Sequence, residues 1–218
     1  MKKEFPAMQV LDPLPISVSR PLVLLRLGYR SAAQVPAKTA RILDEVIADA
    51  ERRLQPRAIC VRIDVARHQD SILLGDEGNS LRSASRSLRE RLDGCASAVL
   101  FAATIGMDIE DRGRALAEAG DLTRSLLLDA YGSSAAIALG LAMETKAAEM
   151  LAPLQPTKRH APGYADFELE AQAPLMRMLD AGRIGITLTD DCLMLPAKSI
   201  TGVIGGRALS EREGTTRP

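Results

Sequence analysis

The chain has 218 residues, enough to bury one good core, and its 28 basic residues balance its 28 acidic ones. Because the formal net charge is zero and aromatic residues make up only 3% of the chain, a nucleic-acid surface or an aromatic cage is not expected. The cysteines, Cys60, Cys95 and Cys192, are widely spaced, which argues against a zinc site or a disulfide framework. The sequence has no apolar leader and no 18-residue apolar run, so we expect a cytoplasmic protein without a membrane segment.

Residues 1–21 contain three prolines and are expected to run extended over the surface, ahead of one globular domain over residues 22–206. Residues 207–218 are polar and charged, and they are expected to form a disordered tail. Helices are predicted where apolar residues recur every three to four positions, over residues 36–54, 81–92, 108–119, 122–151 and 167–179. Strands are predicted for short apolar or alternating runs, over residues 58–65, 72–74, 96–104, 184–188, 193–195 and 199–204.

Two of the predicted helices have informative caps and faces. Ser80 is predicted to cap the helix over residues 81–92, whose arginines form a solvated face or, alternatively, a docking surface for an acidic partner. Asp121 is predicted to cap the helix over residues 122–151, which is apolar on most sides and is expected at the centre of the fold. Strands and helices do not alternate regularly. The sequence therefore predicts an α+β single domain with a mainly antiparallel twisted sheet and packed helices.

Residues 159–164, with the sequence Arg-His-Ala-Pro-Gly-Tyr, carry the clearest chemistry in the chain. Arg159 offers a planar, always-charged, bidentate donor for a carboxylate. Gly163 lets the backbone approach a ligand closely, and Pro162 fixes the local backbone, which lowers the entropy lost on binding. Tyr164 presents a ring face and a hydroxyl to a cationic or nucleoside group. The alternative is an ordinary Pro-Gly turn with a tyrosine at the edge of the core.

The residues that follow this segment favour the functional interpretation, because they match a family pattern over the C-terminal third. The matching stretches are residues 163–172, 183–189, 194–199 and 200–204, with further matches upstream at residues 25–29, 103–106 and 128–133. In these stretches the chain resembles the activation domain of cobalamin-dependent methionine synthase, in its standalone rather than its fused form. The resemblance spans most of residues 22–206 and implies the fold of that domain.

The resemblance implies a subunit that binds S-adenosylmethionine (SAM) and docks on a corrinoid protein to support reductive remethylation of cob(II)alamin. Cobalamin is then carried by the partner, a corrinoid protein or a methionine synthase module, and a flavodoxin-like reductase is a candidate electron donor. The implied SAM-binding residues are Arg159, Ala161, Pro162, Gly163 and Tyr164. Asp190 is a candidate substrate contact, with an exposed acidic turn as the alternative. No catalytic residue and no metal ligand of this chain is implied.

The sequence departs from the family pattern in the predicted long helix. Ile137 and Leu141 stand where family members usually carry acidic residues, and Glu144 is two turns beyond Ile137, so it is not an obvious substitute. If the missing carboxylate recognises the amino group of SAM, its loss weakens or removes SAM binding. The alternative function is therefore a non-catalytic adaptor that binds a corrinoid protein or methyltransferase and has lost SAM binding.

Three further candidates are interpreted as structural. His160 is expected to be a solvent-facing loop residue, because no corrinoid-binding Asp-x-His-x-x-Gly pattern surrounds it. Cys192 is expected to be a small core residue rather than a nucleophile. Lys198 and Ser199 are adjacent on a predicted strand and point to opposite faces, so they are not expected to form a catalytic pair.

Overall fold

The computed structural model describes residues 8–76 and 78–208 of the chain. Within these residues the α-helices are α1 (Arg20–Arg26), α2 (Ala37–Arg53), α3 (Arg86–Arg91), α4 (Asp108–Glu118), α5 (Leu122–Leu151) and α6 (Gln172–Leu179). Short 3-10 helices are η1 (Ala32–Gln34), η2 (Leu169–Ala171) and η3 (Ala181–Ile184). The strands are β1 (Gln9–Leu11), β2 (Arg57–Arg67), β3 (Ile72–Asp76), β4 (Asn79–Ser83), β5 (Cys95–Thr104), β6 (Gln155–Pro156), β7 (Thr187–Leu188), β8 (Met194–Leu195) and β9 (Ser199–Arg207).

The main sheet is antiparallel throughout, in the order β4-β3-β2-β5-β9-β6. The strand β1 pairs with residues 58–60 of β2, and β3 pairs with residues 65–67 of the same strand. Its central strand, β5, is buried on both faces, which explains why its sequence is apolar without alternation. The strands β7 and β8 form a separate small hairpin. The α+β fold with a mainly antiparallel sheet, predicted from the sequence, is confirmed.

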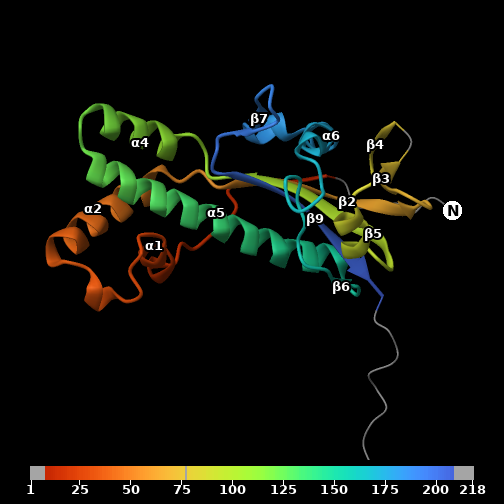
Figure 1. Cartoon of the computed structure of the whole chain (residues 1–218), viewed down its shortest axis with the longest axis horizontal. Helices are drawn as coiled ribbons and strands as arrows, with labels where there is room; N and C mark the ends of the chain where they lie inside the picture. The colour runs from red at the N-terminus through yellow and green to blue at the C-terminus, as the bar shows by residue number, and fades with distance from the viewer. Residues whose placement is uncertain (1–7, 77, 209–218) are drawn as a thin grey trace, which may run out of the picture.

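Helices cover both faces of this sheet (Figure 1). On one face, α1, α2, α4 and α5 enclose a core that includes Val99, Phe101 and Ala103 of β5. On the other face, α3 and α6 pack over Leu100 and Ala102 of the same strand. The alternation of β5 side chains therefore divides the interior into two cores, one on each side of the sheet.

The long helix α5 begins and ends where the sequence predicts. Asp121 accepts a hydrogen bond from the N–H of Arg124 at 3.0 Å and so caps the helix as expected. Of the helices in the described ranges, α5 is the one long and apolar enough to cross a bilayer by length and composition alone. Because it packs along the sheet and 61% of its most apolar window is buried, it has the character of a core helix.

The predicted helix over residues 81–92 is wrong in its first half. Residues Asn79–Ser83 form the edge strand β4 instead, with Leu81 and Ser83 buried and their neighbours outward. The strand satisfies backbone groups along the edge of β3, and this long-range pairing overrides the local helical pattern. The cap of α3 is Ser85 rather than Ser80, since Ser85 Oγ accepts from the N–H of Leu88 at 3.1 Å.

The C-terminal third differs from the prediction at its element ends. The helix predicted from residue 167 begins at Gln172, after the 3-10 turn η2. The strand predicted over residues 184–188 is reduced to β7, because Asp180 and Gly185 adopt left-handed backbone angles (φ 49° and 79°) around η3. The final strand β9 continues to Arg207, so the predicted tail begins too early, and residues 209–218 lie outside the described residues, as do residues 1–7 of the predicted extended segment.

Candidate functional site

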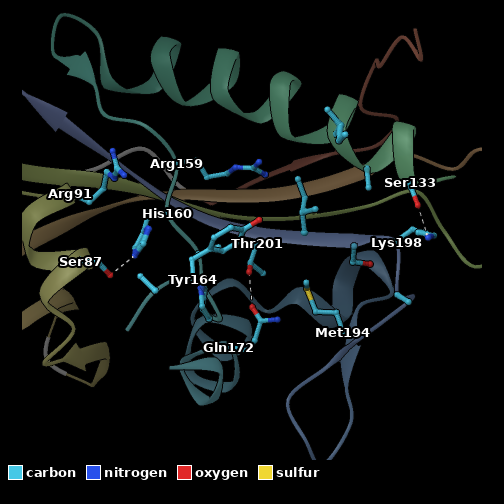
Figure 2. Close-up of a pocket in the computed structure, with 18 of the residues that line it drawn as sticks. Ser87, Arg91, Ser133, Arg159, His160, Tyr164, Gln172, Met194, Lys198 and Thr201 are labelled. Carbon is cyan, nitrogen blue, oxygen red and sulfur yellow. Dashed lines mark hydrogen bonds between the residues drawn. The ribbon is translucent and has the colours of Figure 1, made fainter. Parts of the chain in front are cut away.

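A cavity of about 740 Å³ lies between α5, the segment around residues 159–165, β9 and the β7–β8 hairpin. Figure 2 shows how side chains from these separate segments surround it. Its lining residues are Arg26, Ser87, Arg91, Ser133, Ala136, Ile137, Arg159, His160, Ala161, Pro162, Tyr164, Ala165, Gln172, Met194, Ala197, Lys198, Ser199, Ile200 and Thr201. A pocket of this size with a mixed apolar and polar lining is typical of a small-molecule site.

The segment before the cavity follows the edge strand β6 and is held against β9 by further backbone hydrogen bonds. The N–H of His160 donates to the carbonyl of Val203 at 3.0 Å, and the N–H of Val203 donates back to the carbonyl of His160 at 2.8 Å. Two residues further along β9, the carbonyl of Gly205 accepts a hydrogen bond from the N–H of Thr157 at 2.8 Å. These backbone hydrogen bonds fix the position of the backbone at Arg159, from which its side chain extends.

The loop from Gly163 to Phe167 is closed on itself and tied to α3. Gly163 has a φ of 85°, and its N–H donates to the carbonyl of Phe167 at 2.7 Å. The carboxylate of Asp166 accepts hydrogen bonds from Ser85 Oγ and from the N–H groups of Arg86 and Ser87. These bonds, those from Ser87 first among them, lower the pKa of Asp166. The loop therefore has a fixed geometry.

His160 is buried rather than solvent-facing, so the expectation from the sequence is wrong. Its side chain is 8% exposed, its ring stacks on Phe167 with centroids 5.7 Å apart, and its Nε2 lies 3.0 Å from Ser87 Oγ. Burial, and secondarily the charge of Arg91, lowers the pKa of His160 and favours the neutral ring. The reason for the error is the bridge to Val203, a pairing across the fold that no local pattern reveals.

Arg159 lies in a cradle made by two glycines. A Cβ atom on Gly140 of α5 would lie 2.8 Å from Arg159 Nη1, and one on Gly202 of β9 would lie 2.8 Å from Arg159 Cγ. Both distances are too short for a real side chain, so the arginine occupies the space that the glycines leave. Its Nε also lies 3.5 Å from Glu144 Oε1, one turn of helix beyond Gly140.

The structure brings together four of the five predicted ligand residues as cavity lining: Arg159, Ala161, Pro162 and Tyr164. Tyr164 is 67% exposed, and its ring extends into the cavity (Figure 2). Gly163 does not line the cavity but shapes the loop beside it.

Of the three other candidate residues from the sequence, Ile137 lines the cavity, whereas Asp190 and Leu141 do not. Asp190 is not among the lining residues, and it lies exposed in the turn of the β7–β8 hairpin. Ile137, the first of the two departures from the family pattern, lines the cavity. Leu141, the second, is 61% exposed and does not line it. A carboxylate at residue 137 would therefore lie in the cavity wall, whereas one at residue 141 would not.

Two polar pairs at the cavity wall were not anticipated. Thr201 Oγ1 donates to Gln172 Oε1 at 2.6 Å, and both side chains are buried. Lys198 Nζ donates to Ser133 Oγ at 2.8 Å and lies 2.8 Å from Asp129 Oδ1. These residues come from α5, α6, the turn before β9 and β9 itself, so only the fold assembles them.

The structure agrees with rejection of a Lys198–Ser199 catalytic pair, since Ser199 Oγ hydrogen-bonds to Thr104 Oγ1 at 2.9 Å. Cys192 is half-buried in the hairpin turn with a φ of 60°, so the prediction of a core residue is wrong. Among the described residues, no group of three or more His, Cys, Asp or Glu side chains could hold a metal ion.

A family model described as vitamin B12-dependent methionine synthase, activation domain, matches residues 93–212, more than half of the chain. The chain belongs to this family. The activation-domain match covers α5, the segment around Arg159 and all of β9, but it begins after three cavity residues, Arg26, Ser87 and Arg91.

The fold of this activation-domain chain is also similar to a solved structure, the MetH reactivation domain bound to AdoHcy. The TM-score is 0.72 with 18% sequence identity, and the similarity covers 95% of this chain and 80% of the other. At this level of identity the likeness concerns the fold. A search of curated proteins gives no match to the chain.

Proposed function

We propose that this activation-domain protein binds an S-adenosyl ligand in the cavity beside Arg159 and docks on a cobalamin-binding partner to support its reductive remethylation. The observation that carries the proposal is the cradled position of Arg159 in the wall of a cavity large enough for a nucleoside. Membership of the family and the AdoHcy bound to the structural relative support the same ligand class.

The residues of the cavity fit most of such a ligand. The guanidinium of Arg159 is a bidentate partner for the carboxylate, and Tyr164 presents a ring to the sulfonium or to the adenine. Ser133, Gln172 and Thr201 offer hydroxyl and amide groups for ribose or base. The α-ammonium group has no carboxylate partner among the lining residues within the described ranges.

In this proposal the protein contributes position rather than bond chemistry. The partner's cobalamin would supply the methyl acceptor, one electron would come from a flavodoxin-like reductase, and SAM would leave as AdoHcy. This chain holds the sulfonium end of SAM in a fixed orientation at the mouth of the cavity. The loop held by Asp166 supports that orientation, because the hydrogen bonds between Asp166 and the start of α3 fix the backbone from which Tyr164 projects.

A second function is favoured by one observation. Ile137 presents an apolar side chain to the cavity at the position where an acidic residue is usual in the family. The apolar side chain of Ile137 in the cavity wall is consistent with an adaptor that docks on a corrinoid protein or methyltransferase without binding SAM. Such an adaptor associates with its partner to the same extent whether or not SAM is added.

Calorimetric titration of the purified chain with SAM distinguishes the two functions. The proposal expects binding by the wild type, a loss of at least about tenfold in affinity in Arg159→Ala, and normal binding in the matched control Arg41→Ala. Arg41 is an exposed arginine of α2 that does not line the cavity. If the wild type binds SAM neither alone nor with a corrinoid partner, the adaptor function replaces the proposal.

A further inference from the structure

The charged side chains that line the cavity are all of one sign. Arg26, Arg91, Arg159 and Lys198 are cationic, and in the part of the chain that the structure describes no aspartate or glutamate lines the cavity. They come from four different segments and surround the same space. The charge of the wall is therefore a property of the assembled site rather than of one helix.

Two of these cations are partly neutralised from outside the cavity. Lys198 Nζ lies 2.8 Å from Asp129 Oδ1, and Arg159 Nε lies 3.5 Å from Glu144 Oε1. Neither carboxylate lines the cavity, and Glu144 belongs to a neighbouring hollow of about 480 Å³. Both carboxylates therefore reduce, but do not reverse, the positive potential that a ligand meets.

The other two cations are not compensated. Arg26 and Arg91 form no ion pair with any residue of the ranges 8–76 and 78–208. The Nε of Arg91 is buried and has no hydrogen-bond partner within the same ranges. His160 also lines the cavity, and burial lowers its pKa, which favours the neutral ring. Two of the four cations that line the cavity therefore have no ion-pair partner in the described part of the chain.

We propose that this cavity discriminates against positive ligand charge, so that it holds the thioether AdoHcy more tightly than the sulfonium SAM. The inference rests on the proposed S-adenosyl site. The two ligands share adenosine, carboxylate and ammonium groups, and they differ by one methyl group and the positive charge on sulfur. Selection between them therefore reports the electrostatic potential of the wall.

The opposing attraction is too small to reverse this preference. The ring of Tyr164 attracts a sulfonium, but at an exposed site a cation–π contact changes affinity by about two- to fivefold. Tyr164 is 67% exposed. Repulsion from uncompensated cations in a partly desolvated cavity is larger, on the order of tenfold. A site with this preference retains the demethylated product and responds to the ratio of SAM to AdoHcy.

Titration calorimetry of the full chain with SAM and with AdoHcy, at low and high salt, tests this inference. We expect AdoHcy to bind about tenfold more tightly at low salt, and the ratio to fall as salt screens the repulsion. Equal or tighter binding of SAM overturns the inference and leaves the proposed function intact. Binding of neither ligand overturns both.

The substitution Arg26→Gln, with Arg41→Gln as its control, tests whether the cations of the wall cause the preference for AdoHcy. Each substitution removes one exposed arginine from a helix, but Arg26 lines the cavity and Arg41 does not. We expect Arg26→Gln to narrow the AdoHcy-to-SAM affinity ratio by about two- to fivefold and Arg41→Gln to leave it unchanged. An equal AdoHcy-to-SAM affinity ratio in the two variants would contradict an electrostatic origin of the preference for AdoHcy.

Discussion

Replacement of Gly140 by alanine tests whether the position of Arg159 matters for binding rather than for folding. The added Cβ would lie 2.8 Å from Nη1 and 3.1 Å from both Cζ and Nη2 of Arg159. Because the guanidinium is the far end of a flexible side chain, it moves and the helix does not. The side chain then no longer rests where Gly140 and Glu144 now hold it.

The substitution Gly140→Ala is expected to change folding stability and ligand affinity in opposite directions. Alanine in place of glycine in a helix interior stabilises by roughly 0.5–1 kcal/mol, so the free energy of unfolding is expected to stay constant or rise slightly. A misplaced guanidinium loses a charge-assisted hydrogen bond to the ligand carboxylate, worth about 1.5–3 kcal/mol. We therefore expect the affinity for SAM or AdoHcy to fall by about 10- to 150-fold in a protein at least as stable as the wild type.

Urea unfolding and calorimetric titration of the same samples measure the two effects. Gly113→Ala is the matched control, because Gly113 lies in α4 and an added Cβ there meets no atom within 4 Å. The control is expected to gain the helical stability and to keep the affinity. If Gly140→Ala binds as tightly as Gly113→Ala, Arg159 is not the carboxylate partner and the reasoning fails.

Two further predictions concern the supports of the site. Gly202→Ala is expected to destabilise the fold by about 1–3 kcal/mol in urea unfolding, because its Cβ would lie 2.6 Å from Phe101 Cε1 in the centre of the sheet. Gly182→Ala, whose Cβ meets nothing within 4 Å, is the control, and equal midpoints for the two would contradict the crowding argument. Asp166→Asn is expected to lower the unfolding temperature at neutral pH. Its folded pKa lies below the ordinary 3.8, so the stability from Asp166 is present above pH 3.8 and is lost as pH falls below it. The difference between wild type and Asp166→Asn should therefore shrink on acidification, and a difference that is the same at pH 7 and pH 3 would argue against this role.

The elements that the sequence predicts well are those determined by local patterns. The limits of α5 follow from a cap and a long apolar repeat, and β5 follows from an uninterrupted apolar run. The sequence motif at residues 159–164 likewise identifies one wall of the cavity. Each of these features depends on residues close together in the chain.

The elements that it misses depend on partners far away. The strand β4 exists because β3 offers an edge, and His160 is buried because β9 pairs with it. The cradle of Arg159 left a weak signal, since Gly140 interrupts a helical pattern and Gly202 a strand, which indicates close approach of another group. What approaches each glycine becomes visible only in the folded chain.

The attachment of Asp166 to the start of α3 joins two parts of the molecule that are about eighty residues apart. A helix that contributes only Ser87 and Arg91 to the cavity wall therefore sets the height and tilt of the loop that presents Tyr164. A substitution on the outer surface of α3 that shifts the first turn of this helix would also shift the loop at Asp166, and with it the position of Tyr164 in the cavity. In divergent relatives, the surface of this helix is the place to look for changes in specificity that the binding residues themselves do not explain.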